Sequence, residues 1–368
     1  MENLYIHVPF CAKKCDYCAF YSVENSSRTM HERWLEKIRC DLQKNAHRLQ
    51  QVKTLYFGGG TPTLPDHDLL EKIFQTVLSE IRLVPDAEIT SEANPETITA
   101  ERAAVLGKYV NRISMGVQSF REEKRKVLGR YPIHTEKIVP ALTLLRDAGL
   151  NNIGVDLMYA VPGETLAQWK EDLKRAMDLG VEHLSAYALT PEENTPYAVT
   201  HGLKAADDDL ASDMWHTVDE VSAAYGMERY EISNYAKKGF EAKHNCNVWF
   251  GETYLGLGPS ATSFDGVDRW TEQADLTAWL AGAEADWDRI SRPARIREVL
   301  IMGLRTVKGW DKEKFSAASG CRTWCDAETK DILNALQDQG LISFNSESCR
   351  ATKTGLEFWN SIAEQLIL

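Results

Sequence analysis

Three cysteines within eight residues constrain this chain more than any other feature. Cys11, Cys15 and Cys18 lie in the stretch Cys-Ala-Lys-Lys-Cys-Asp-Tyr-Cys, in a chain of 368 residues. Thiolates this close together on one loop suit a soft metal centre. A zinc site usually combines two separated ligand pairs, and no further Cys-x-x-Cys or His-x-x-x-His pair follows. The spacing therefore predicts a [4Fe–4S] cluster in which three irons are bound by cysteine and the fourth is open to a ligand.

Short runs rich in Val, Ile and Tyr recur along the first half of the chain, and each is followed by a stretch with helical periodicity. The expected strands lie at residues 4–8, 54–57, 88–93, 112–117, 152–159 and 183–189. Nearly continuous apolar strands that alternate with helices predict an α/β fold with a parallel sheet and right-handed crossovers. Six such units make a partial (β/α)6 barrel, whose chemistry lies at the C-terminal ends of the strands. The cysteine loop follows the first of them.

The pattern changes beyond about residue 190. We expect a core at residues 1–190, a connecting region at 191–294 with a helix at 207–225, and a small helical domain at 295–368. The last part reads helix–strand–wing–helix and ends in an amphipathic helix from Thr354, a pattern shared with DNA-binding winged helices. It contains equal numbers of basic and acidic residues, which favours a structural or lid role over DNA binding.

Charge and hydropathy limit the partners and the location. The formal net charge is −12, which disfavours tracking of nucleic-acid phosphates. The short basic cluster of Lys124, Arg125, Lys126 and Arg130 is interpreted as a solvated helix face. No apolar run approaches the roughly 20 residues that span a bilayer, and the first residues do not resemble a signal peptide. We expect a cytoplasmic protein with no transmembrane segment and no nucleic-acid partner.

The context of the cysteines resembles a known family. The Cys-x-x-x-Cys-x-x-Cys motif after the first strand is similar to that of the radical SAM superfamily, and Tyr5-Ile6-His7-Val8-Pro9-Phe10-Cys11 resembles the opening of the oxygen-independent coproporphyrinogen III oxidase-like family. The resemblance extends from Tyr5 to the final helix. It implies that the open iron binds S-adenosylmethionine (SAM), and that one electron from the cluster cleaves SAM to a 5′-deoxyadenosyl radical. His7 is expected to serve packing.

Polar residues at successive strand ends match positions that bind SAM in this family. The segment Gly58-Gly59-Gly60-Thr61-Pro62 is similar to the family's segment that contacts the SAM amino group. Asp156 lies within an apolar strand, where a charge is costly unless it is paired or binds a ligand. The cofactor-binding residues that the resemblance implies are Tyr5, Tyr17, Gly59, Gly60, Thr61, Glu92, Gln118, Arg130 and Asp156.

Two departures from the oxidases favour the haem-chaperone branch of the family, HemW. Phe20 stands where the decarboxylating oxidases have a fourth cysteine, and the oxidases carry a longer N-terminal extension. His244-Asn245-Cys246-Asn247-Val248-Trp249 resembles a haem-associated motif of this branch, except that Val248 replaces a tyrosine. His and Cys are both good haem ligands. His244 is thus a candidate haem ligand or a structural residue, and Cys246 a second ligand or a buried side chain.

The sequence therefore predicts a haem chaperone of the radical SAM superfamily. It would bind a [4Fe–4S] cluster, SAM and haem, take an electron from a donor, and deliver haem to an acceptor protein, as a carrier rather than an enzyme. Two alternatives stay open, both of them enzymes. One is the oxidative decarboxylation of coproporphyrinogen III, and the other is a methyltransferase or cyclopropanase that uses two SAM molecules.

Overall fold

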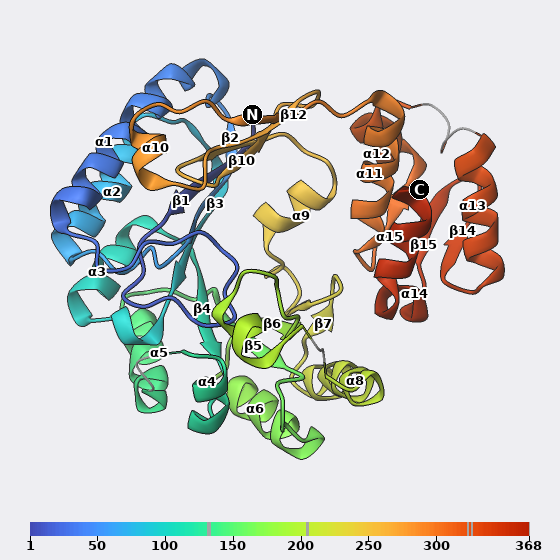
Figure 1. Cartoon of the computed structure of the whole chain (residues 1–368), viewed down its shortest axis with the longest axis horizontal. Helices are drawn as coiled ribbons and strands as arrows, with labels where there is room; N and C mark the ends of the chain where they lie inside the picture. Colours follow the sequence, from blue (N-terminus) through green and yellow to red (C-terminus); the bar gives the residue numbers. More distant parts are fainter. Residues whose placement is uncertain (131–133, 204–205, 322–323, 325–326, 368) are drawn as a thin grey trace.

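Six parallel strands form the centre of the structure and follow one another in chain order (Figure 1). The computed structural model describes residues 1–130, 134–203, 206–321, 324 and 327–367. Each strand pairs in parallel with the next, and β1 and β6 do not pair with each other, so the barrel is partial, as predicted. The six strands are β1 (Asn3–Val8), β2 (Val52–Gly59), β3 (Leu83–Ala93), β4 (Arg112–Gln118), β5 (Ile153–Tyr159) and β6 (His183–Ala188).

Helices cover the outer face of these strands. Their apolar sides pack on the sheet, and polar side chains cap the N-termini of some of them: Ser27 accepts from Met30 N–H, and Thr165 forms a capping box with Gln168. The helices are α1 (Arg28–Lys44), α2 (His67–Ser79), α3 (Ala100–Tyr109), α4 (Glu122–Val127), α5 (Ile138–Asp147) and α6 (Leu166–Asp178). Short 3-10 turns lie at η1 (Ala46–Arg48), η2 (Pro95–Thr97) and η3 (Thr135–Lys137).

Side chains alternate between the two faces of the barrel strands. In β1, Leu4, Ile6 and Val8 are fully buried in the main hydrophobic core. Tyr5 and His7 point to the opposite, inner face. The sequence suggested nearly continuous apolar strands, whereas the structure shows a polar inner face. That face lines the interior of the barrel and carries most of the candidate site.

The expected connecting region contributes strands to both edges of the sheet. Beyond β6 lie β8 (Asn234–Ala236) and β7 (Glu228–Arg229), and beyond β1 lies β9 (Tyr254–Leu257), which pairs with it in parallel. The sheet continues through β10 (Thr262–Phe264), β11 (Arg269–Thr271) and β12 (Asp286–Asp288). The helices of this region are α7 (Pro196–His201), α8 (Asp208–Ala224), α9 (Lys243–Trp249) and α10 (Leu276–Leu280). The division at residues 190 and 294 stays a prediction.

The C-terminal part has its own core beside the barrel (Figure 1). Its three-stranded sheet and surrounding helices confirm the expected winged-helix-like fold. Where one final helix was predicted, the chain forms two, with a break at Phe358. The elements are α11 (Arg292–Leu304), β13 (Trp310–Asp311), α12 (Lys312–Ser319), α13 (Ala327–Asp338), β14 (Ile342–Phe344), β15 (Ser348–Ala351), α14 (Lys353–Glu357) and α15 (Trp359–Ile367).

The basic cluster after β4 is not a solvated helix face, so that prediction is wrong. Lys124 and Arg125 on α4 are buried, as is Arg130, and Lys126 alone of the four is exposed. Partners from distant parts of the chain offset the cost of burying these charges, and a local sequence pattern cannot reveal them.

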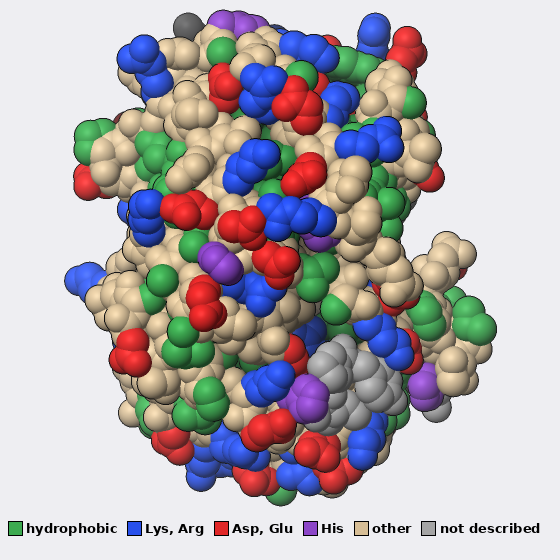
Figure 2. Space-filling model, turned by 90° about the vertical axis from the view of Figure 1, so that its left-hand side faces the viewer, with side chains coloured by type: hydrophobic (Ala, Val, Ile, Leu, Met, Phe, Trp, Pro, Cys, Tyr) green, Lys and Arg blue, Asp and Glu red, His purple; other side chains and the backbone are tan. Residues whose placement is uncertain are grey.

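The molecular surface in Figure 2 is the side that lies at the left of Figure 1, where α1, α2 and α3 are found. Basic and acidic side chains are interspersed over it, so this face offers no continuous basic surface for nucleic-acid phosphates. No helix among the described residues is long and apolar enough to cross a bilayer.

Candidate cofactor site

The cysteine loop leaves the C-terminal end of β1 and closes on itself. Cys11 N–H donates to the Val23 carbonyl at 3.1 Å, and Val23 N–H donates to the Pro9 carbonyl at 2.6 Å. All three thiols are partly exposed. Among the described residues, no three His, Cys, Asp or Glu side chains converge as they would around one metal ion. The preference for a polynuclear cluster with an open iron over a zinc ion therefore still rests on the spacing of the three cysteines in one loop.

Burial opposes the ionised form of two of these thiols. It raises the pKa of the Cys11 thiol and of the Cys18 thiol above the usual value. Thr61 Oγ1 lies 3.7 Å from Cys11 Sγ and partly offsets this effect. Thiolates in such a place need cations around them, a charge that the iron of a bound cluster would supply.

The three glycines at the end of β2 let this strand approach β1 and the cysteine loop. A Cβ at Gly59, whose φ is 111°, would lie 2.7 Å from the His7 ring, and a Cβ at Gly60 would lie 2.7 Å from the Phe10 carbonyl oxygen. Gly59 N–H donates to Glu92 Oε2 at 3.1 Å. The sequence suggested close approach to a ligand, and the structure shows that the chain's own backbone also requires glycine here.

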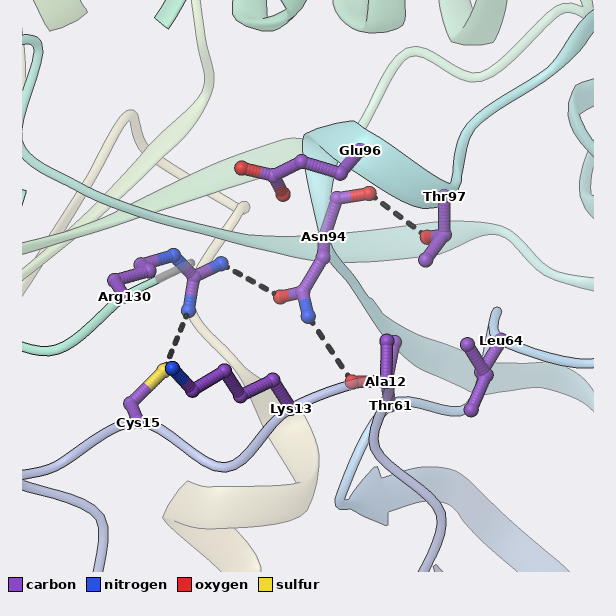
Figure 3. Close-up of a pocket in the computed structure, with 9 residues that line it drawn as sticks. All are labelled: Ala12, Lys13, Cys15, Thr61, Leu64, Asn94, Glu96, Thr97 and Arg130. Carbon is purple, nitrogen blue, oxygen red and sulfur yellow. Dashed lines mark hydrogen bonds between the residues drawn. The ribbon is translucent and has the colours of Figure 1, made fainter. Parts of the chain in front are cut away.

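A chain of polar contacts joins the cysteine loop, through Arg130, to the ends of β2 and β3 (Figure 3). Arg130 Nη1 lies 3.7 Å from Cys15 Sγ, and its Nη2 donates to Asn94 Oδ1 at 2.8 Å. Asn94 Nδ2 donates to Thr61 Oγ1 at 3.0 Å. These residues line a pocket against the loop, together with Lys13. The structure thus brings the predicted residues Thr61 and Arg130 into one network with the cysteines.

Two carboxylates lie on the inner face of the barrel. Glu92 accepts hydrogen bonds from Tyr56 Oη at 2.9 Å and from Gly59 N–H. Burial and, to a smaller extent, the nearby charge of Asp156 raise the pKa of Glu92 to about 7. Asp156 accepts from Ser114 Oγ at 3.1 Å, and burial raises its pKa as well. Two half-buried carboxylates with raised pKa values favour a bound cation, because a positive charge restores their ionised forms.

Three more predicted residues lie around this end of the barrel. Gln118 ends β4 with a φ of 67°, a conformation that residues other than glycine adopt at a cost. Tyr17 lies on the cysteine loop, and its hydroxyl contacts Arg130. Tyr5 Oη lies 3.1 Å from His7 Nδ1, and His7 Nε2 also meets the Tyr21 carbonyl at 2.9 Å. His7 is buried with two protein partners, in agreement with a packing role.

His244 lies at the other end of the barrel. It is the second residue of α9, its Nδ1 is 2.7 Å from Thr54 Oγ1, and its ring lies 5.1 Å from that of Tyr56. Thr54 stands near the start of β2 and Gly59 at its end, a separation of roughly 16 Å along an extended strand. The His244 side chain is 7% exposed, and burial lowers its pKa to about 3. The His244 ring lies 6.5 Å from that of Tyr5, so the structure brings His244 near this one predicted SAM residue, while the cysteine loop lies at the opposite end of the strands.

Comparisons with known proteins place these observations in a family. Residues 5–176 match the Radical SAM superfamily, and residues 290–358 match the HemN C-terminal domain. "Heme chaperone HemW" of Escherichia coli (strain K12) is 33% identical over 98% of this chain and 97% of its own length. The protein of the same name from Lactococcus lactis is 30% identical over 100% of this chain and 97% of its own length. The chain belongs to the HemW family of radical SAM proteins.

The fold of this HemW-family chain has a close counterpart among solved structures. "Coproporphyrinogen III oxidase (HemN) from Escherichia coli" superposes with a TM-score of 0.83 at 22% identity, over 99% of this chain and 90% of that one. At this identity the likeness shows the fold. It agrees with the partial barrel and the C-terminal domain predicted from the sequence.

Sequence reasoning missed two residues of the barrel interior. Asn94 follows β3 directly and carries the contact between Thr61 and Arg130, and its place just after a predicted strand end was the signal. Arg112 begins β4 and is 2% exposed, and its Nε has no hydrogen-bond partner among the described residues. A buried guanidinium facing the interior calls for an ordered water or a ligand group near it.

Proposed function

We propose that this HemW-family chain binds a [4Fe–4S] cluster through Cys11, Cys15 and Cys18, holds SAM at the adjoining end of the barrel, and carries haem to an acceptor protein. The observation that carries the proposal is the meeting of the cysteine loop with polar residues from successive strand ends, joined through Arg130 and Asn94. The names of the HemW relatives, which cover nearly the whole chain, support the carrier role.

The residues around the cysteine loop suit a cationic ligand. Glu92 and Asp156 present carboxylates to the interior, and Thr61 and Gln118 add polar groups at neighbouring strand ends. Arg130 offers a positive charge toward the cysteine loop, where a ligand carboxylate would also be received. When bound, a cluster of this type supplies an electron to SAM. The remaining candidate contacts are Tyr5, Tyr17, Gly59 and Gly60.

His244 has one ring nitrogen left for a metal. The Thr54 hydroxyl donates its proton to Asn3 Oδ1, so His244 Nδ1 carries the proton that joins it to Thr54. Its Nε2 therefore keeps the lone pair that an axial haem ligand needs. The ring is buried beneath α9, so haem reaches it in this proposal only when α9 shifts. Cys246 on the same helix is partly exposed, and burial raises its pKa to about 12, which makes it the weaker ligand.

The proposal implies two protein partners, an electron donor and a haem acceptor, and a cytoplasmic location. The test is anaerobic reconstitution followed by parallel titrations with haem and with coproporphyrinogen III, scoring binding and turnover separately. We expect about one haem per chain and no conversion of coproporphyrinogen III in the presence of SAM and reductant. Conversion without stoichiometric haem binding would favour the decarboxylase. If the chain neither binds haem nor converts coproporphyrinogen III, the methyltransferase or cyclopropanase class is the alternative that remains.

A further inference from the structure

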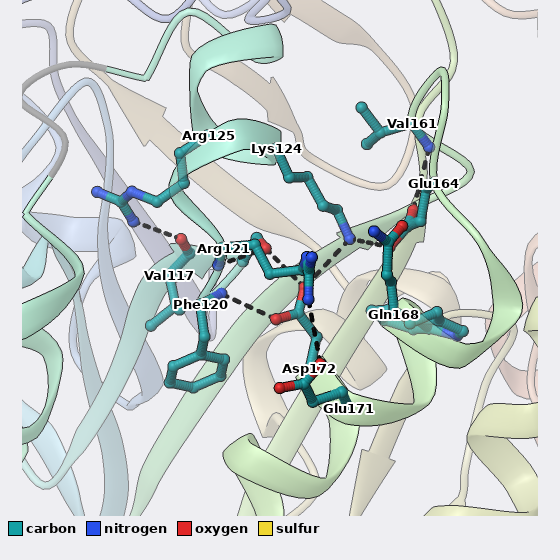
Figure 4. A network of polar contacts seen from close by, with 12 residues as sticks. Val117, Phe120, Arg121, Lys124, Arg125, Val161, Glu164, Gln168, Glu171 and Asp172 are labelled. Atoms are coloured by element: carbon teal, nitrogen blue, oxygen red, sulfur yellow. Dashed lines mark hydrogen bonds and ion pairs between the residues drawn. The ribbon is translucent and has the colours of Figure 1, made fainter.

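A buried triad of charged residues joins α4 to α6 and the residues just before it (Figure 4). Lys124 Nζ on α4 forms an ion pair with Glu164, just before α6, and lies 3.4 Å from Asp172 Oδ2 on α6. The three side chains are 5%, 3% and 0% exposed. Charges this deeply buried are costly unless they are held in one well-defined arrangement. The triad therefore fixes α4 against α6.

Asp172 also holds the turn between β4 and α4. Its carboxylate accepts hydrogen bonds from the Ser119 hydroxyl at 2.6 Å and from Phe120 N–H at 3.0 Å. The preceding residue, Gln118, has the left-handed backbone conformation, which persists only when its surroundings enforce it. Asp172 accepts two of the hydrogen bonds that hold the backbone of Gln118 in this conformation.

The other end of α4 contacts the cysteine loop. Asp16 N–H donates to the Leu128 carbonyl at 3.1 Å. Gly129 follows with a φ of 60°, and a Cβ there would lie 2.0 Å from Asp16 Cγ, so this contact needs glycine. Arg130 comes next and reaches Cys15. One short segment thus connects the end of β4 to the cysteine loop.

The position of α4 depends on its tertiary contacts. The helix is six residues long, which is too short to be stable alone in water. Besides the triad, Arg125 holds it by donating to the Val117 carbonyl at 2.7 Å and by pairing with Glu96. Arg125 ties α4 to the strand end beneath it, and the triad ties it to the neighbouring helix.

We propose that the triad of Lys124, Glu164 and Asp172 is a positioning element for SAM: it fixes α4 so that Gln118 before the helix and Arg130 after it are held in place together. The inference rests on the proposed SAM site. No member of the triad touches the ligand, and each acts through Gln118 or Arg130.

The experiment compares two variants of the reconstituted full chain. Asp172→Asn removes one negative charge of the triad with little change in shape. Glu171→Gln is the matched control, since its side chain is a neighbour on α6, is 57% exposed and pairs with Arg121 at the surface. Asp172→Asn should keep its iron and its circular dichroism, bind SAM about tenfold more weakly, and show a smaller SAM-induced change in the EPR spectrum of the reduced cluster. Glu171→Gln should match the wild type in iron content, circular dichroism, SAM affinity and EPR response.

Wild-type SAM affinity and EPR response in folded Asp172→Asn would overturn the proposal. Failure of the wild type to bind SAM would instead overturn the proposed function, so the two failures are distinguishable. Should Asp172→Asn not fold, Ser119→Ala takes its place, because it removes one bond to Asp172 and leaves every charge paired. A severalfold loss of SAM affinity at full iron content in Ser119→Ala supports the proposal, and unchanged affinity overturns it.

Discussion

Arg130 Nη1 lies 3.7 Å from the sulfur of Cys15, so the segment that follows α4 and the cysteine loop meet at a charged contact. Arg130 is 6% exposed, and it also donates to Asn94 and to the Gly116 carbonyl. A buried positive charge beside a thiolate stabilises the thiolate and any added electron on a cluster bound to it.

Loss of this charge should make the cluster harder to reduce. Arg130→Met is expected to shift the reduction potential of the cluster to a more negative value and to weaken SAM binding. Arg130→Lys keeps the charge, so its reduction potential should lie between those of the wild type and Arg130→Met. A redox titration followed by EPR measures the shift. A potential in Arg130→Met that equals the wild-type value would contradict this role.

The three loop cysteines should be required for iron. Anaerobically reconstituted wild type is expected to carry about four irons per chain with a broad visible absorption, and Cys15→Ala should lose both. Cys40→Ala is the control, because Cys40 lies on α1, away from the loop. Iron retained in the triple Cys11, Cys15 and Cys18 variant would show that the cluster is held elsewhere.

SAM binding should strengthen as the pH rises through about 7. The pKa of Glu92 is about 7 rather than the usual 4.5, so the SAM-free chain takes up a proton there that a cationic ligand must displace. Affinity is therefore expected to rise by up to about tenfold per pH unit below this pKa. Glu92→Gln should bind SAM more weakly and lose this part of the pH dependence. Calorimetric titrations at pH 6, 7 and 8 on both proteins measure the difference.

Protonation of Glu92 also makes the free energy of unfolding depend on pH. Between pH 4.5 and about 7 the folded chain binds the Glu92 proton and the unfolded chain does not. The contribution of Glu92 to the free energy of unfolding should thus fall as the pH rises through this window. Denaturant titrations of wild type and Glu92→Gln test it, and the difference between them should shrink toward pH 4.5.

His244 should decide the haem spectrum. His244→Ala is expected to shift or erase the Soret band of the haem complex, whereas Cys246→Ala should leave it largely intact. An unchanged band in His244→Ala would assign the imidazole to a structural role through Thr54 instead. Circular dichroism of the haem-free variant separates loss of a ligand from loss of the fold.

One ion pair with a buried carboxylate should hold the C-terminal part on the barrel. Glu231 is fully buried and accepts two hydrogen bonds from Arg305, at 2.9 and 2.8 Å. Glu231→Ala leaves that guanidinium without its partner and is expected to lower the free energy of unfolding by about 3–5 kcal/mol. Lys353→Ala removes a pair with Asp219 whose lysine is 62% exposed, and it should cost less than about 1 kcal/mol. Equal effects of the two variants in denaturant unfolding would contradict this assignment.

The sequence predicted the strands of the barrel well because their spacing follows local rules. All six expected strands occur, and the cysteine loop follows β1 as expected. The largest difference lies in β3, which starts at Leu83 rather than at residue 88, since Pro85 and Asp86 interrupt the apolar pattern that marks a strand.

Contacts between residues far apart in the sequence could not be predicted from local sequence patterns. Lys124 and Arg125 read as solvated charges because their partners, Asp172 and Glu96, lie 48 and 29 residues away. The same limit applies to His244, whose Thr54 partner is 190 residues distant, so its place at the opposite end of the barrel from the cysteines came from the fold alone.

The most direct test of the account is the EPR spectrum of the reduced, reconstituted chain with and without SAM. Direct binding of SAM to an open iron predicts that saturating SAM changes the g-values and line shape of the wild-type signal, with Cys15→Ala as a signal-free blank. In Glu92→Gln we expect a smaller change at subsaturating SAM. A wild-type spectrum that is identical with and without saturating SAM would contradict it.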